Sequence, residues 1–147
     1  MGNPNIKPNE RATLIGVIDP DANAAATYLT GAIDLGNFES CMAIVMAGTL
    51  GTNATIDAKL VQATTSGGTY KDVTGKAITQ LTDAGTDSDK QAIINCRSDE
   101  LDVANGYRYV KLSMTVATAT SDSGAILLGF DARYQPATDA TTVDEIV

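Results

Sequence analysis

Two parts of the chain alternate apolar and polar residues with the two-residue period of a β-strand. From Val110 to Val116 every second residue is apolar, and lysine, serine and threonine occupy the positions between them. This alternation is typical of a strand with one buried side, and it predicts a strand over residues 107–116. Residues 56–73 contain a similar stretch, then a pair of glycines, then a second short stretch. This order predicts a β-hairpin with a glycine turn.

Two other segments are apolar at nearly every position. They are Cys41–Ala47 and Ala125–Phe130, and neither contains a charged residue. In a β protein, a segment of this kind predicts a strand that is covered on both sides. We therefore expect Cys41–Ala47 to be the central strand of a sheet, or to turn one face toward a partner chain. Residues 119–124 are expected to close a hairpin into Ala125–Phe130.

The remaining segments extend the same pattern along the chain. Ala12–Ile18 is predicted to form a first strand that ends at the Asp-Pro-Asp turn of residues 19–21, and Tyr28–Leu35 a second strand. One helical turn is expected at Ser98–Leu101. About eight short strands with frequent turns indicate an all-β, antiparallel β-sandwich. Its connectivity is either that of a jelly roll or that of an immunoglobulin-like Greek key, and the pattern leaves both open.

The chain of 147 residues is predicted to hold one domain with an arm at each end. Residues 1–10 contain two prolines and three asparagines. Such residues favour neither a helix nor the interior of a sheet, so this segment is expected to be an extended N-terminal arm. The sandwich is expected to span residues 11–134. Residues 135–147 combine a proline with several threonines and acidic residues, which predicts a flexible C-terminal arm.

Composition narrows the classes of function. Hydrophobic residues make up 44% of the chain but aromatic residues only 5%, so the core is thin, which favours further burial by oligomerisation or docking. The net charge is −8, and no cluster of lysine or arginine occurs, which disfavours direct nucleic-acid binding. No apolar stretch approaches the roughly 20 residues of a membrane span, and no signal peptide is evident. We therefore expect no membrane partner, and synthesis in the cytoplasm.

The residue types that usually carry catalysis are scarce. The chain has no histidine, and nothing places another base beside a nucleophile, so we expect neither enzymatic activity nor a cofactor. Asp83, Asp87 and Asp89 offer oxygen ligands, but their spacing does not match a calcium loop, and a solvated loop is favoured over a metal site. Cys41 and Cys96 lie in or at the end of apolar segments. They are expected to be small buried hydrophobic residues rather than a disulfide.

Three tyrosines carry the other candidate chemistry. The rings of Tyr70, Tyr107 and Tyr109 offer faces on which a sugar can stack, with hydroxyl groups to orient it. Tyrosines at the start of strands more often pin a loop to the core with the ring and bond the backbone with the hydroxyl. We favour this structural role over sugar binding.

Two runs of sequence resemble a known family. They are Lys59–Gln62 followed by Ser66–Val73, and Asn105–Leu112 followed by a strand that ends in Ala132–Pro136. Together with the intervening residues 78–82, they cover most of the chain after Phe38. Their pattern of strands and turns is similar to that of small head proteins of tailed bacteriophages.

This resemblance implies a capsid decoration protein, also called a cement protein. Such a protein is a β-sandwich, often a trimer, that binds the outer surface of the lattice of the major capsid protein and reinforces the head of the virion. Arms before Arg11 and after Tyr134 would reach neighbouring subunits. The composition of the arms then suggests contacts to the capsid or between subunits at Asn5, Ile6, Lys7, Arg11, Arg133, Tyr134 and Pro136.

Two other functions stay open at this point. The same fold serves as the base of head fibres and in adhesins, so the runner-up is a carbohydrate-binding or receptor-binding module. A cluster of exposed aromatic residues on one face or loop would support that function. The third possibility is an intracellular bacterial β protein with another role.

Overall fold

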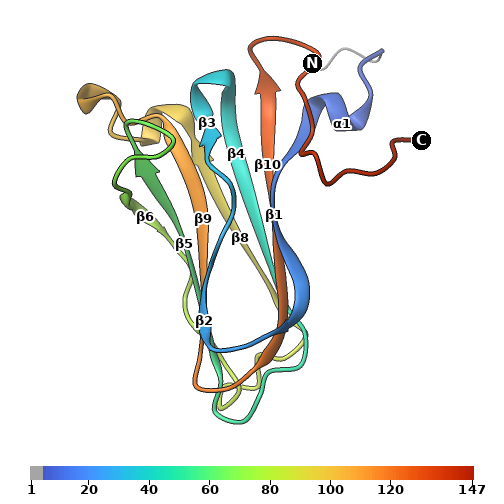
Figure 1. The fold of residues 1–147 in the computed structure, drawn as a ribbon, viewed down its shortest axis with the longest axis vertical. Coiled ribbons are helices and arrows are strands. Elements are labelled where there is room, and N and C mark those ends of the chain that lie inside the picture. Colours follow the sequence, from blue (N-terminus) through green and yellow to red (C-terminus); the bar gives the residue numbers. More distant parts are fainter. Residues whose placement is uncertain (1–4) are drawn as a thin grey trace.

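The computed structural model describes residues 5–147, which form a sandwich of two antiparallel β-sheets (Figure 1). The first layer, here the four-stranded sheet, contains in spatial order β1 (Ala12–Asn23), β10 (Ser121–Ala132), β4 (Phe38–Ala47) and β8 (Gln91–Arg97). The second layer, here the six-stranded sheet, contains β2 (Ala26–Leu29), β9 (Tyr109–Ala117), β5 (Thr55–Ala63) and β6 (Lys71–Ala77), with β3 (Ile33–Asp34) beside β9 and β7 (Leu81–Thr82) beside β5. The predicted antiparallel sandwich is confirmed, with β3 and β7 as two short additions.

The strand order identifies the connectivity as that of a jelly roll. The backbone crosses to the opposite sheet after β1, β3, β4, β7, β8 and β9. Among the long strands, only β5 and β6 follow each other within one sheet. An immunoglobulin-like sandwich instead joins several consecutive strands side by side in one sheet. Repeated crossing between two layers, each with four main strands, is the jelly-roll arrangement. It decides between the two topologies that the sequence pattern leaves open.

The core lies between the two sheets and consists mainly of aliphatic residues. The alternation predicted for β9 is confirmed, because every second residue from Val110 to Val116 is at most 1% exposed. Val45 on β4 and Leu127 on β10 close the core from the opposite sheet, and both are fully buried. The two layers therefore meet through side chains that alternate along their strands, which is the packing expected for a sandwich.

The predictions for hairpins and central strands have mixed outcomes. The hairpin predicted within residues 56–73 is confirmed, because β5 and β6 are antiparallel neighbours with Gln62 opposite Lys71. The interior position predicted for Cys41–Ala47 is confirmed as well, since β4 lies between β10 and β8. The hairpin predicted at residues 119–124 is wrong. These residues connect β9 to β10, which belong to different sheets.

The first two predicted strands have different boundaries in the structure. The turn predicted at residues 19–21 lies within β1, which continues to its end at Asn23. The register of β1 shifts between Ile18 and Asp21, and such a bulge on an edge strand accommodates the proline between them. The second predicted strand, Tyr28–Leu35, is divided among β2, β3 and the short 3-10 helix η1 (Leu35–Asn37).

Short helices occur at three further places. The N-terminal arm was predicted to lack helix, but it contains the single turn α1 (Pro8–Arg11). Proline is favourable at the first helical position, and the Glu10 carboxylate accepts the N–H of Lys7 at 2.8 Å. The helical turn predicted after β8 is present as η2 (Ser98–Glu100), and η3 (Val103–Asn105) follows it. Within residues 5–147, none of the helices has the length and apolarity needed to cross a bilayer.

Candidate functional site on the outer face of the four-stranded sheet

The outer face of the six-stranded sheet is polar. Cross-strand partners in an antiparallel sheet project from the same side, so the register shows which residues share a face. Thr27, Thr115 and Asp57 are partners across β2, β9 and β5, and the two threonine hydroxyl oxygens lie 2.9 Å apart. Ser113 and Lys59 form the neighbouring pair on this side. This face is suited to contact with water.

The outer face of the four-stranded sheet is apolar. Two rows of cross-strand partners run across its four strands on this side. The first row is Val17, Ile126, Ile44 and Ile93, and the second is Leu14, Leu128, Met42 and Asn95. Met46 extends the apolar surface along β4. We define the apolar outer face as these residues without Asn95.

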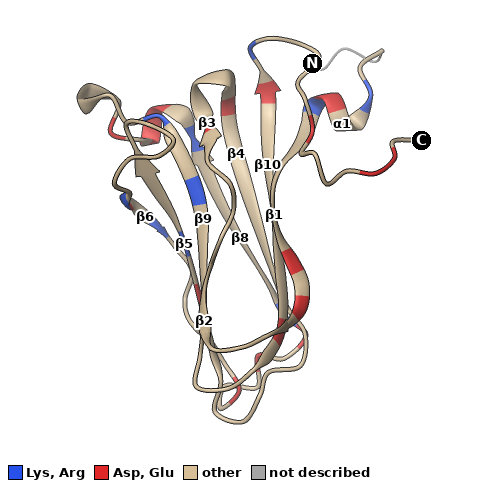
Figure 2. Cartoon of the chain, viewed as in Figure 1, with Lys and Arg blue, Asp and Glu red and all other residues tan. Residues whose placement is uncertain are grey.

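The apolar outer face is open to solvent. Ile93 is 58% exposed and Met46 is 53% exposed, and neighbours on the sheet leave the other members half-buried. The middle of β4 and of β10 carries no charged residue, and Figure 2 shows the charges of these strands near their ends. Antiparallel sheets that face water usually alternate apolar and polar residues. An exposed sheet face with a row of apolar residues across all four strands is typical of a surface that contacts another molecule.

A pocket deepens the apolar outer face where β1 bends. Its volume is about 480 Å³, and Val17, Met46 and Ile126 are among its lining residues. Gly124 and Pro20 also line it, and a Cβ added to Gly124 would lie 2.9 Å from the Cα of Pro20. This close approach of β1 to β10 requires glycine. The pocket offers a place into which an apolar side chain of a partner can insert.

The two arms meet at one end of the sandwich (Figure 1). The Asp139 carboxylate accepts the backbone N–H of Leu14 at 2.9 Å and the side-chain amide of Asn9 at 3.3 Å. The backbone N–H of Ala140 donates to the Leu14 carbonyl at 2.7 Å. The C-terminal arm therefore covers part of the free edge of β1. Because Leu14 belongs to the apolar outer face, the arms lie directly beside that face.

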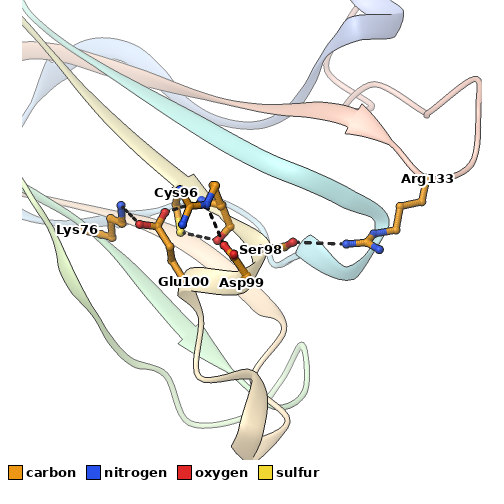
Figure 3. Close-up of polar contacts among 7 residues, drawn as sticks. Lys76, Cys96, Ser98, Asp99, Glu100 and Arg133 are labelled. Atoms are coloured by element: carbon orange, nitrogen blue, oxygen red, sulfur yellow. Dashed lines mark hydrogen bonds and ion pairs between the residues drawn. The ribbon is translucent and has the colours of Figure 1, made fainter.

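The structure places the predicted interface residues in two groups. The first group lies in or beside α1 and just after β10, at the same end of the sandwich, and consists of Asn5, Ile6, Lys7, Arg11, Tyr134 and Pro136. In this group Tyr134 is 78% exposed. Arg133 forms the second group alone. Its guanidinium lies 3.4 Å from Ser98 Oγ (Figure 3) and 3.4 Å from a Glu39 carboxylate oxygen.

A polar cluster that sequence reasoning missed surrounds Cys96 at the end of β8 (Figure 3). The Glu100 carboxylate accepts the N–H of Arg97 at 2.7 Å and pairs with Lys76 Nζ at 3.0 Å, which joins η2 to β6. Cys41 lies directly opposite Cys96 in the ladder of β4 and β8, and both are buried, as predicted. The hydrogen bond between the two thiols, together with burial, raises the pKa of Cys41. The same hydrogen bond lowers the pKa of Cys96.

The tyrosines considered as a platform for sugars hold cations against their rings. Lys111 Nζ lies 4.4 Å from the centre of the Tyr70 ring, and Lys71 Nζ lies 4.0 Å from the centre of the Tyr107 ring. The Tyr70 hydroxyl donates to the carbonyl of Ser66 at 2.9 Å. These contacts fasten the loop between β5 and β6, and they cover ring faces on which a sugar would stack.

The acidic loop after β7 uses its carboxylates to hold the backbone. Asp83 accepts the N–H of Asn53 at 2.9 Å. Asp87 pairs with Lys90 Nζ at 2.7 Å and accepts the N–H of Thr82 at 2.9 Å, and these two bonds lower the pKa of Asp87. The loop is therefore fastened to the end of the sandwich through these two side chains.

Fold and site together define a jelly-roll protein with an apolar outer face on its four-stranded sheet. No protein-family model matches the chain, and no curated protein is significantly similar to it.

Proposed function

We propose that this protein is a structural virion protein that binds the outer surface of a tailed-phage capsid and stabilises the head. The observation that carries the proposal is the uncharged, apolar outer face on a chain of net charge −8. The occupant of this face is the major capsid protein. Two further features support the proposal: the resemblance to small phage head proteins, and the jelly-roll fold, which serves in viral capsids.

The size of the apolar outer face limits how firmly one copy can attach. The eight residues of this face, on strands about 4.8 Å apart and in rows about 7 Å apart, cover roughly 270 Å². Each partner contributes about 800 Å² to an interface of standard size. At about 25 cal/mol per Å², burial of the face supplies roughly 7 kcal/mol before the costs of association are subtracted. A single face is therefore marginal, and further contacts must add to it.

The arms and a homo-oligomer supply the further contacts. The arms lie beside the apolar outer face, so they contact the capsid protein around the rim of that face. Lys7 and Arg11 bring positive charge to this end of an acidic protein, although each exposed ion pair contributes only about 0–1 kcal/mol. The resemblance implies an oligomer, often a trimer. An oligomer gains avidity because every contact after the first is intramolecular.

Co-sedimentation with heat-expanded capsids of a candidate phage tests this function. Ile44→Glu puts a charge at the centre of the apolar outer face, and Thr115→Glu puts the same charge on the polar outer face as a matched control. We expect wild type and Thr115→Glu to pellet with the shells, and Ile44→Glu to stay in the supernatant. All three should have the same circular dichroism spectrum, because both side chains lie outside the core.

Two results would contradict the proposal. Attachment of Ile44→Glu at the wild-type level would show that the apolar outer face is not the contact. A wild-type protein that ignores the shells would reject the function itself, and a glycan screen would then test the carbohydrate-binding alternative. The lysines against Tyr70 and Tyr107 argue against that alternative, because they cover the ring faces that it needs.

A further inference from the structure

The two edges of the four-stranded sheet are protected differently. At one edge, β1 carries a bulge with a proline, and the C-terminal arm bonds to Leu14. At the other edge, β8 has no proline, no lysine and no shift of register. Edge strands usually carry such features, because their free N–H and C=O groups otherwise pair with another chain. Within the described part of the chain, β8 is an open edge.

The backbone of β8 shows which groups are available for pairing. Ala47 N–H donates to the Lys90 carbonyl at 2.9 Å, so Lys90 and every second residue after it bond to β4. Gln91, Ile93 and Asn95 lie between these residues and direct their backbone groups away from the sheet. No hydrogen bond joins those backbone groups to another element within residues 5–147. The same residues project from the outer side, where Ile93 is 58% exposed.

We propose that β8 pairs antiparallel with β8 of a second copy, about a twofold axis at Ile93. In this register Ile93 faces Ile93 of the second copy, and Asn95 faces Gln91. Three residue pairs then exchange about two hydrogen bonds each. The neighbouring register, with Ile93 opposite Asn95, loses the contact between the two exposed Ile93 side chains at the axis.

The pairing joins two apolar outer faces into one continuous surface. The row that ends at Ile93 continues into the same row of the second copy, so apolar side chains run across eight strands in place of four. The combined area is roughly 540 Å², about two thirds of the contribution of one partner to a standard interface. The pairing depends only on the fold, and the proposed function adds that the pair docks on the shell as a unit. A twofold pair is a dimer, unlike the trimer that the resemblance implies.

Cysteine crosslinking combined with light scattering tests the pairing. Ile93→Cys brings two thiols to the axis, because hydrogen-bonded partners have Cα atoms about 5.5 Å apart, within reach of a disulfide. Asn95→Cys is the matched control on the same strand, since the two Asn95 Cα atoms would lie about 14 Å apart. Leu29→Cys, with 53% exposure on β2, controls for random collision. The native cysteines are buried, and wild type oxidised with diamide measures their background.

We expect wild type to have the mass of two chains, and Ile93→Cys to form covalent dimers at least tenfold faster than either control. A monomeric wild type, or a trimer with equal crosslinking of the three variants, would overturn the pairing. The outcomes also separate this inference from the proposed function. A crosslinked dimer that ignores shells keeps the pairing and rejects the function. A protein that binds shells but does not crosslink through Ile93→Cys keeps the proposed function and rejects the pairing.

Discussion

Gly129 on β10 is a position at which the addition of a single carbon atom tests the packing of the core. Its backbone lies against the buried ring of Phe38, and an added Cβ would lie 2.6 Å from Cδ1 and 2.7 Å from Cε1 of that ring. Alanine in a strand would otherwise gain about 0.5–1 kcal/mol over glycine. Overpacking of a core costs about 1–3 kcal/mol. We therefore expect Gly129→Ala to lower the free energy of unfolding by about 1–2 kcal/mol, which is roughly 2–8 °C in Tm.

The test is a double-mutant cycle measured by urea denaturation. Phe38→Leu removes the ring atoms that the new Cβ would meet. The double variant Gly129→Ala/Phe38→Leu should therefore lose less free energy of unfolding than the two single variants lose in sum, by about 1 kcal/mol. Gly31→Ala is the control, because no atom lies within 4 Å of its added Cβ. It should change stability by less than about 0.5 kcal/mol. Wild-type stability of Gly129→Ala, or strictly additive single losses, would refute the reasoning.

Two further predictions concern an ion pair and the C-terminal arm. The Arg108 guanidinium, whose Nε donates to Asp34 Oδ1 at 2.8 Å, holds the pKa of Asp34 below its ordinary 3.8. A depressed folded-state pKa gives stability that is present above pH 3.8 and is lost as the pH falls through the folded-state value. Asp34→Asn should therefore lower the free energy of unfolding at pH 7 by up to about 1 kcal/mol, a small value because Arg108 is half exposed. Urea denaturation of the variant and of wild type should give converging stabilities below pH 3.8. Asp139→Ala removes the carboxylate that accepts the Leu14 N–H, so hydrogen exchange at the Leu14 amide should become several-fold faster. Asp144→Ala is the control and should leave that rate unchanged. An unchanged rate in Asp139→Ala would disprove the attachment of the arm.

Local sequence patterns predicted the strands well where the pattern depends on neighbouring residues alone. The alternation in β9 follows from one buried side, and the glycine pair before Tyr70 follows from the geometry of a tight turn. The errors arose where pairing over long sequence distances decides the structure. Residues 119–124 resemble a hairpin turn, but β10 pairs with β1 and β4 instead of β9, and no local signal reveals that choice.

The candidate site was predictable only in part for the same reason. Apolar residues on both sides of β4 and β10 predicted strands covered on both sides, but the structure leaves their second apolar face, the outer one, open to solvent. Val17 and Ile93 join it only through the register of β1 and β8 with those strands. The contact between Asp139 and Leu14 spans nearly the whole chain, and an aspartate in a polar arm gives no sign of its partner.

The contrast between a bare apolar sheet and an acidic chain has a consequence for handling the protein. A flat apolar surface with an open edge strand promotes aggregation. Electrostatic repulsion between copies of net charge −8 opposes that aggregation. That repulsion vanishes near the isoelectric point of about 4.3 and is screened over about 8 Å at physiological salt. Acidity thus keeps copies of the protein apart in solution despite the exposed apolar outer face.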